Sequence, residues 1–269
     1  MDLLRNIKRY LILYWIFVKN CVISQMEYRI NFYISCLIQL AFMGIKVTYV
    51  IVLYNAGVAI NGVTPDQMMI FIGTYSALSG VFVSLFLINF SSLSHQIRTG
   101  ELDMLIVKPV SLQFMATLRR IDLGFALVSV TTGGAMIIIG WMRAGIAVNF
   151  INVAVFIGFT IWGIFLTYSV FLIPNIFAFW IISTRGLSQV VNQMWDFNNM
   201  PMIIYTNIIR TIGLFVIPIF VITNFGAMFI LDMMNPWLIL WGILAPIVFF
   251  FISRSFWNFA VKRYCSASS

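Results

Sequence analysis

The stretch HQIRTGELDMLIVKPVSLQFMATLRR, residues 95–120, is the most polar part of a chain that is otherwise mostly apolar. It holds acidic and basic residues, a glycine before Glu101 and a proline after Lys108. Its histidine, His95, is the only histidine of the chain, so a Ser–His nucleophile pair would have to use a residue of a charged loop. A solvated role fits such a loop histidine better, and we expect no catalysis here.

Other motifs for catalysis or nucleotide binding are missing from the sequence. It contains no GxxxxGK(S/T) phosphate loop, no HExxH and no GxSxG. Its three cysteines, Cys21, Cys36 and Cys265, lie far apart and form no CxxC pair. With a single histidine this predicts no metal site, and the thiols are expected to be reduced or buried. We therefore expect no catalytic, cofactor-binding or metal-binding residues in this chain.

The composition identifies an integral membrane protein. The 269 residues are 62% hydrophobic and only 9% charged, with a mean hydropathy of +1.00, whereas a soluble chain carries about 25% charged residues. The net charge of +8 could suggest nucleic acid. Lysines and arginines spread between apolar runs instead reflect orientation in a membrane, so no nucleic-acid partner is predicted.

Six apolar runs are long enough for membrane-spanning helices, which need about 20 residues. The runs are continuously apolar, while strands of a membrane barrel would alternate and be about half as long. The fourth run is too long for a simple span, so we expect a bend near Pro174 or a continuation into the cytosol. No linker or repeat divides the chain, which predicts one all-α integral membrane domain over residues 1–269. The six spans cover approximately residues 30–54, 67–92, 121–141, 150–182, 208–231 and 236–258.

Residues 1–28 precede the first span and are amphipathic. Apolar residues recur there at helical spacing, and the basic residues Arg5, Lys8 and Arg9 lie mostly between them. This pattern is typical of a helix that lies in the membrane interface; the alternative is the start of a longer first span. No cleavable signal peptide is expected, because the first apolar run is short and is interrupted by Lys19.

The basic residues also predict the orientation. With the N-terminus inside, the basic residues of segments 1–29, 93–120 and 254–263 are cytoplasmic, whereas the three outer loops hold only Arg143. We expect both Arg185 and Arg210 to lie in or beside the next inner loop. We therefore expect a multi-pass protein of the cell (cytoplasmic) membrane, with both termini and the 93–120 loop in the cytoplasm.

Few charges are expected inside the bilayer. Lys46 falls within a span, where snorkelling toward an interface is favoured over a substrate contact. Ion-coupled carriers typically have carboxylates inside the bilayer. In this chain none of the eight acidic residues falls near the middle of a predicted span. If the protein moves a substrate, its energy source is therefore expected outside this chain.

The 93–120 loop between the second and third spans has the features of a docking element. Gly100 would end a first short helix, and Glu101 and Asp103 would favour the start of a second one. Pro109 would end this second helix, and Ser111 could cap the next.

The short helix between Gly100 and Pro109 has a mixed surface. Leu102, Leu105 and Ile106 would line one side of it, beside the charged residues. Such a helix suits a groove on another protein; the alternative is an ordinary solvated loop.

Three segments resemble type-2 ATP-binding-cassette (ABC) exporter permeases. IRTGELDMLIVKPVSLQF is similar to their inner loop, and LFVIPIFVITNFGAMFI, with Pro218, to their fifth-span segment. SRSFWNFAVKRYCSAS is similar to their tail through Arg254, Phe256, Trp257, Arg263, Tyr264 and Ser266. The family often has a further proline near NFGA, which is missing here at residues 224–227. The inner-loop pattern corresponds to Arg98, Gly100, Glu101, Leu102, Leu105, Ile106, Lys108, Pro109 and Ser111.

The resemblance implies a type-2 ABC exporter permease fold: six transmembrane helices preceded by an interfacial elbow helix, with short re-entrant helices near residues 223–235. It implies pairing with a second permease, identical or homologous, and with two cytoplasmic ATPase subunits that bind ATP and Mg²⁺. The ATPase-docking coupling helix would consist of Arg98, Gly100, Glu101, Leu102, Asp103, Leu105, Ile106, Lys108 and Pro109.

The predicted function is therefore the non-enzymatic permease subunit of an ABC exporter, and family members move drugs, peptides, lipids or glycans outward. The alternative is a membrane scaffold or assembly factor that docks a cytoplasmic protein, and an ion-coupled carrier is disfavoured. Co-purification of a protein with a phosphate loop would separate the first two. Four polar residues could contact a substrate, although helix packing is favoured for them: Asn175, Gln193, Asn198 and Asn199.

Overall fold

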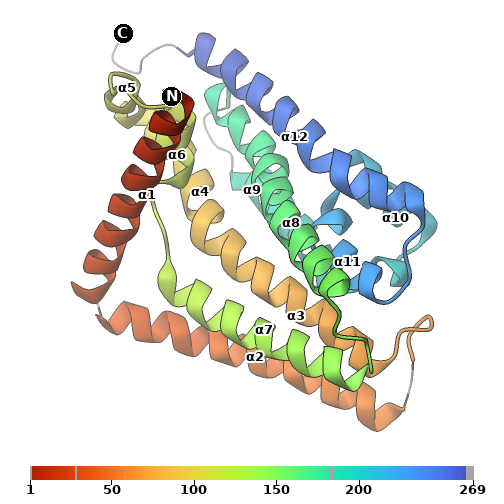
Figure 1. Ribbon diagram of the computed structural model, residues 1–269. Helices are drawn as coiled ribbons and strands as arrows, with labels where there is room; N and C mark the ends of the chain where they lie inside the picture. The colour runs from red at the N-terminus through yellow and green to blue at the C-terminus, as the bar shows by residue number, and fades with distance from the viewer. Residues whose placement is uncertain (1, 28, 58, 182–184, 265–269) are drawn as a thin grey trace.

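The computed structural model describes residues 2–27, 29–57, 59–181 and 185–264 (Figure 1). These residues form helices, apart from short connections and one isolated bridge between Ile60 and Val63. Cys265 and Ser266 of the tail motif lie outside the described residues. The helices are α1 (Asp2–Glu27), α2 (Arg29–Ala56), α3 (Pro65–Val81), η1 (Phe82–Leu87), α4 (Ile88–Arg98), α5 (Glu101–Ile106), α6 (Leu112–Leu118), α7 (Leu123–Arg143), α8 (Phe150–Ile176), η2 (Phe177–Phe179), α9 (Arg185–Asp196), η3 (Phe197–Asn199), η4 (Met202–Ile204), α10 (Asn207–Thr211), η5 (Ile212–Val216), α11 (Ile219–Ile230) and α12 (Pro236–Lys262).

Five helices are long and apolar enough to cross a membrane, and a bent pair could make a sixth. They confirm the all-α membrane fold predicted from the sequence. One of them is a continuous helix of 34 residues formed by α3, η1 and α4, with a π-helical stretch in its middle. The five cover Arg29–Ala56, Pro65–Arg98, Leu123–Arg143, Phe150–Phe179 and Pro236–Lys262.

Polar residues in the turns fix where these helices begin. Thr64 accepts a hydrogen bond from the Gln67 N–H while the Gln67 side chain accepts one from the Thr64 N–H, a reciprocal cap at the start of α3. Asn149 and Asn235 cap α8 and α12 in the same region of the molecule.

Glycine lets the helices α3 and α7 approach closely. A Cβ atom on Gly133 would lie 2.6 Å from the backbone nitrogen of Ala77, and one on Gly73 would lie 2.8 Å from the Gly133 carbonyl oxygen. Small residues allow such backbone contact between apolar helices, where burial from water contributes little.

Most of the basic residues gather at one end of the molecule, here called the basic end. It consists of α1, α5, α6 and the last turns of α4 and α12, which lie together in Figure 1. At the opposite end Arg143 forms an ion pair with Asp66, with 3.0 Å between Nε and Oδ1. Arg210 also lies at the opposite end, because it donates to the carbonyl of Ile203, which accepts a second hydrogen bond from Asn61 between α2 and α3. The expectation that Arg210 belongs with the inner basic residues is therefore corrected.

The predicted fifth span, residues 208–231, is bent rather than continuous. The chain bends by 102° between the helices on either side of Ile217 and Pro218, since a proline removes a backbone donor and interrupts the helix. The first half begins next to the Ile203 carbonyl, and the second half ends just before α12 starts. Both ends of the pair therefore lie at the opposite end, so the pair enters the bundle and returns. The resemblance implied re-entrant helices near residues 223–235, whereas this pair begins earlier, at Asn207, and ends at Ile230.

Residues 185–204 connect the two ends instead. Before them, Phe179 of η2 packs on Trp257 and Tyr264 of α12, at the basic end. Further along, Trp195 lies in the middle of the bundle, and the Ile203 carbonyl reaches Asn61. The sequence placed this segment in an inner loop, because it contains too many polar residues to form an apolar run.

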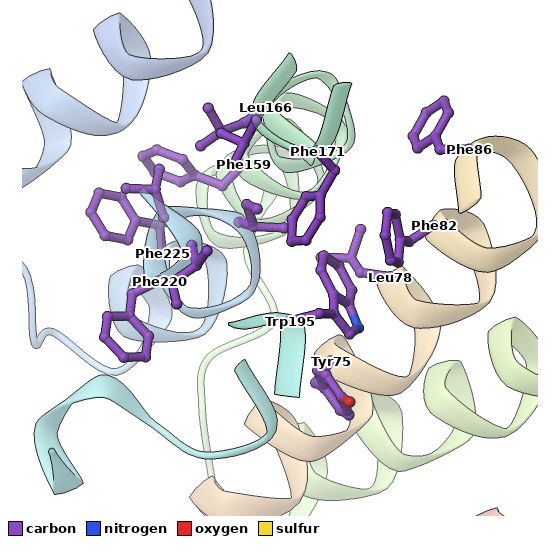
Figure 2. Packing of buried hydrophobic residues seen from close by; sticks show 14 of the residues in the cluster. Tyr75, Leu78, Phe82, Phe86, Phe159, Leu166, Phe171, Trp195, Phe220 and Phe225 are labelled. Carbon is purple, nitrogen blue, oxygen red and sulfur yellow. The ribbon is translucent and has the colours of Figure 1, made fainter. Parts of the chain in front are cut away.

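Trp195 joins three helices in the aromatic core. Its ring stacks on Phe82 with 4.5 Å between centroids and meets Phe171 edge-on at 5.3 Å. Its indole N–H donates to the Ser79 hydroxyl at 3.0 Å. Figure 2 shows Trp195 between Tyr75, Phe82 and Phe171. The polar segment is thus held in the core by one large aromatic anchor whose only polar atom is satisfied.

Candidate functional site: a docking segment at the basic end

The short helix α5 has the boundaries that the sequence predicts. Gly100 adopts a left-handed conformation with φ of +75° and separates α4 from α5. Glu101 and Asp103 occupy the first turn of α5, and the helix ends before Pro109. Ser111 stands directly before α6, but its side chain makes no capping hydrogen bond, so that detail of the prediction is wrong.

The apolar residues of α5 divide between two sides. Leu102 and Leu105 are 0% and 4% exposed and pack into the protein's own core. Met104, Ile106 and Val107 are 73%, 46% and 82% exposed. The expectation that Leu102 and Leu105 fill a partner's groove is therefore corrected, because residues three apart on this helix share the inward side.

The charged residues predicted for docking surround the exposed side of α5. Arg98 and Lys108 are exposed, as is Pro109, and Glu101 and Asp103 are partly buried. The exposed apolar residues and these charges form what we call the α5 face: Arg98, Glu101, Asp103, Met104, Ile106, Val107 and Lys108.

Helix α1 holds the loop that follows α5. The Arg9 guanidinium donates to the Pro109 carbonyl at 2.6 Å, and the Ser111 N–H donates to the Tyr10 hydroxyl at 3.0 Å. Arg9 was predicted only as a basic group near lipid head groups, together with Arg5 and Lys8, which are exposed. No local pattern of residues predicts this contact, because Arg9 and Pro109 are 100 residues apart.

Aromatic packing continues the contact between α1 and α6. Phe114 meets the ring of Tyr10 at 5.0 Å, that of Phe17 at 5.9 Å and that of Tyr14 at 6.4 Å. Burial, reinforced by nearby Cys21, raises the pKa of the Tyr14 hydroxyl, which is therefore neutral.

Farther along α1, Gln25 donates to the Ile121 carbonyl at 2.6 Å and accepts from the Leu123 N–H at 3.1 Å. Helix α1 thus lies along the whole path from Pro109 to the start of α7. In Figure 1 it runs in a different direction from α2, so it is a separate helix and not the start of the first span.

Three membrane-spanning elements hold α6 and the residues that follow it from the other side. The Arg254 guanidinium of α12 donates to the Gln113 side-chain oxygen, and the Gln113 amide donates to the Tyr168 hydroxyl of α8 at 2.9 Å. Asn89 of α4 both donates to the Arg120 carbonyl, at 2.7 Å, and accepts from the Arg120 N–H, at 2.9 Å. A displacement of α5 and α6 would therefore be transmitted to α1, α4, α8 and α12.

The sequence of the chain matches a known protein family. Residues 32–268, most of its length, match the family model described as ABC-2 family transporter protein. The chain belongs to this family. No curated protein and no solved structure gave a match.

The match confirms the predicted family and gives the chain the role of a membrane component of an ABC transporter. It starts at residue 32, so helix α1 lies outside the matched part and is assigned by its contacts alone.

A second polar group of this ABC-2 chain lies in the middle of the bundle. The Lys46 ammonium of α2 donates to the Ser76 hydroxyl at 3.2 Å and lies 4.8 Å from the centre of the Tyr75 ring. The Tyr75 hydroxyl donates to Asp196 of α9 at 3.2 Å. We call Lys46, Tyr75, Ser76 and Asp196 the central polar cluster. Asp196 was expected outside the spans, because residues 185–204 were assigned to a loop.

Three of the four polar residues considered as substrate contacts, Gln193, Asn198 and Asn199, lie within three residues of Asp196. Among the described residues, the hydrogen bonds of Asn175 and Asn198 go to other partners than this cluster. Asn175 donates to the Phe171 carbonyl of its own helix, and Asn198 accepts from Thr223 of α11. Both are buried, which agrees with the packing role favoured for them. Gln193 is exposed and Asn199 is partly exposed.

Proposed function

We propose that this chain is the permease subunit of an ABC exporter and that the α5 face docks on a cytoplasmic ATPase. The chain would pair with a second permease, identical or homologous, and with two ATPase subunits that bind ATP and Mg²⁺. Both termini and the basic end would face the cytoplasm of a cell membrane, in accord with the distribution of basic residues.

The observation that carries the proposal is the two-sided construction of α5. Its inward leucines pack into the core, and the loop donates hydrogen bonds to Tyr10 and Asn89 and accepts them from Arg9 and Arg254. These contacts fix the loop in the permease. Its outward side presents Met104 and Val107, two large apolar residues that cost free energy while they face water. Exposed apolar residues ringed by charges are typical of a protein-binding surface.

Transport would then follow from a two-state movement. ATP binding would bring the two ATPases together and push both α5 faces, and the contacts of α6 would carry this movement into α4, α8 and α12. Coupling of this kind requires that the ATPase contacts differ between the two states. The sequence has no phosphate loop, so the energy would come from the partner.

The docking test replaces the two most exposed apolar residues of the α5 face. Met104→Ala combined with Val107→Ala should reduce recovery of the ATPase in a pull-down at least about tenfold, since loss of interface anchors costs about 2 kcal/mol or more. The recovered partner is identified by mass spectrometry as a protein with a phosphate loop that binds ATP.

A matched control lies at the opposite end, where Val148 and Phe150 are equally exposed, at 75% and 87%. Val148→Ala combined with Phe150→Ala should leave recovery unchanged. Undiminished ATPase recovery by the correctly inserted Met104/Val107 variant would refute docking through α5. Recovery of a cytoplasmic protein without a phosphate loop would favour the scaffold alternative.

A further inference from the structure

A cavity of about 520 Å³ lies at the basic end, between η1, α6, α8 and α12. Its volume is within the range of about 300–1,000 Å³ that small-molecule sites occupy. Most of its wall is apolar and is formed by side chains such as Phe86, Leu118, Ile164 and Phe250. Phe165, which is half exposed, stands on the outer surface of α8 and also lines the cavity.

The polar part of the wall is a short chain of hydrogen bonds. The Gln113 oxygen accepts from Arg254, and its amide nitrogen donates to the Tyr168 hydroxyl, which also bonds Thr117 at 3.0 Å. The polar groups of Gln113 and Tyr168 therefore already have hydrogen-bond partners within the protein.

Arg254 differs from these residues because it brings a positive charge. A guanidinium has five N–H donors, and the hydrogen bond to Gln113 uses one of them. The ion pair between Arg143 and Asp66 lies at the opposite end of the molecule and does not involve Arg254. None of the described residues that line the cavity is acidic, so these residues do not balance the charge of Arg254.

The depth of Arg254 suits the head group of a lipid. It lies eight residues before the end of α12, about 12 Å at a rise of 1.5 Å per residue. A long arginine side chain at this depth reaches toward the head-group region of the bilayer. Basic pockets between membrane-spanning helices are suited to anionic lipids, whose phosphate matches the fork of a guanidinium.

We propose that this cavity binds an anionic phospholipid from the leaflet at the basic end. Its phosphate would pair with Arg254, and an acyl chain would lie along Phe86, Ile164 and Phe250. The proposal does not depend on which ATPase binds α5 or on what is transported. Because Gln113 belongs to α6, the lipid would contact the same helix that anchors the docking segment.

The experiment uses the full chain, purified and reconstituted into phosphatidylcholine nanodiscs. A small amount of phosphatidylglycerol with a photoreactive diazirine in its acyl chain is added, and the labelled peptides are mapped by mass spectrometry. Phosphatidylglycerol should label peptides of α6, α8 and α12 around the cavity at least about tenfold more than diazirine-bearing phosphatidylcholine, as expected for a charge-assisted pair.

Competition separates a lipid from a free anion. Unlabelled phosphatidylglycerol should suppress the labelling, and inorganic phosphate should not. Equal labelling by both lipids would overturn the proposal, and so would suppression by inorganic phosphate, which would indicate a site for a soluble anion.

Three variants locate the site. Arg254→Gln should lower the phosphatidylglycerol labelling to the phosphatidylcholine level, and Arg254→Lys should keep part of the preference. Arg263→Gln is the matched control directly after the same helix, because Arg263 lies over the Phe259 ring and is not among the residues that line the cavity. Undiminished labelling of Arg254→Gln would contradict the assigned role of Arg254.

Ile164→Trp tests the cavity with Arg254 intact. The larger ring should fill the space for the acyl chain and reduce labelling at least about tenfold. This variant still tests the lipid site if the Arg254→Gln protein fails to fold. Unchanged labelling of a folded Ile164→Trp protein would place the lipid elsewhere.

Discussion

The docking segment at the basic end and the central polar cluster place polar groups in an apolar chain in different ways. In the docking segment, a glycine, a proline and two acidic residues at neighbouring positions define α5 locally. In the central polar cluster, Lys46, Tyr75 and Asp196 come from α2, α3 and α9 and meet only after the chain has folded. Local signals fix an element, whereas a contact across 121 residues depends on the whole bundle.

The largest expected effect is the all-or-none accessibility of introduced cysteines, which tests the path that brings Asp196 into the bundle. The native cysteines Cys21, Cys36 and Cys265 are first replaced by serine. Arg210→Cys should then react with an impermeant thiol reagent from the same side as Asn61→Cys. Lys108→Cys should react only from the other side, because residues 185–204 connect the two ends.

With the basic end in the cytoplasm, positions 61, 210 and 234 should label in whole cells. Labelling of position 210 together with position 108 would mean that residues 207–230 cross the membrane as one broken span. Residues 185–204 would then not connect the two ends, and α9 would not bring Asp196 into the central polar cluster.

The same contrast explains how much of the fold was predictable. Five spans follow from continuous apolar runs, and Gly100 and Pro109 mark the ends of α5. The path of residues 185–204 through the bundle was not predicted, because this segment is mostly polar. Only one side of it is buried, with Trp195 as its anchor, and the neighbouring helices supply the other apolar surfaces. The mean hydropathy of the whole segment includes its polar side as well, so it indicates a loop and not a membrane-spanning helix.

The candidate site was predictable in its position but not in its orientation. Which side of α5 faces inward depends on the turn at Gly100 and on the packing of α4 and α6, so Leu102 and Leu105 could not be distinguished from Met104 and Val107 in the sequence. The anchors Arg9, Tyr10 and Gln113 are also invisible locally, since each bonds a residue more than 50 positions away.

The second prediction concerns the two sides of α5. Leu102→Ala and Leu105→Ala should each reduce the free energy of unfolding by about 2–5 kcal/mol, because they leave cavities in the core. Met104→Ala and Val107→Ala should change it by less than about 0.5 kcal/mol in the isolated chain. The measurement is denaturant unfolding in detergent followed by tryptophan fluorescence. Equal losses on both sides would show that α5 is oriented differently.

The third prediction concerns the central polar cluster. Lys46→Met and Asp196→Asn should each destabilise the protein, and the double variant should lose about 1 kcal/mol less than the sum of the two, as for residues that share a partner. The coupling is modest because Asp196 is exposed at one side. The same unfolding assay measures all four proteins.

Asp232→Asn provides the control for this cycle. Asp232 lies between α11 and α12 and has a φ of +55°, which asparagine also tolerates. Its effect should add to that of Lys46→Met within about 0.5 kcal/mol. An additive cycle for Lys46 and Asp196 as well would mean that Tyr75 does not couple them.

The smallest expected effect is the loss of one hydrogen bond between α1 and the loop after α5. Tyr10→Phe keeps the ring on Phe114 but removes the acceptor of the Ser111 N–H, at a cost of about 0.5–1.5 kcal/mol. If opening of this loop limits exchange, the amides of residues 110–112 should exchange hydrogen about two- to tenfold faster, as measured by mass spectrometry. Tyr14→Phe is the matched control, because Tyr14 also packs on Phe114 and no backbone N–H of the loop donates to its hydroxyl. Faster exchange in both variants would assign the effect to ring packing, and unchanged exchange in Tyr10→Phe would show that Arg9 and α6 hold the loop without this bond.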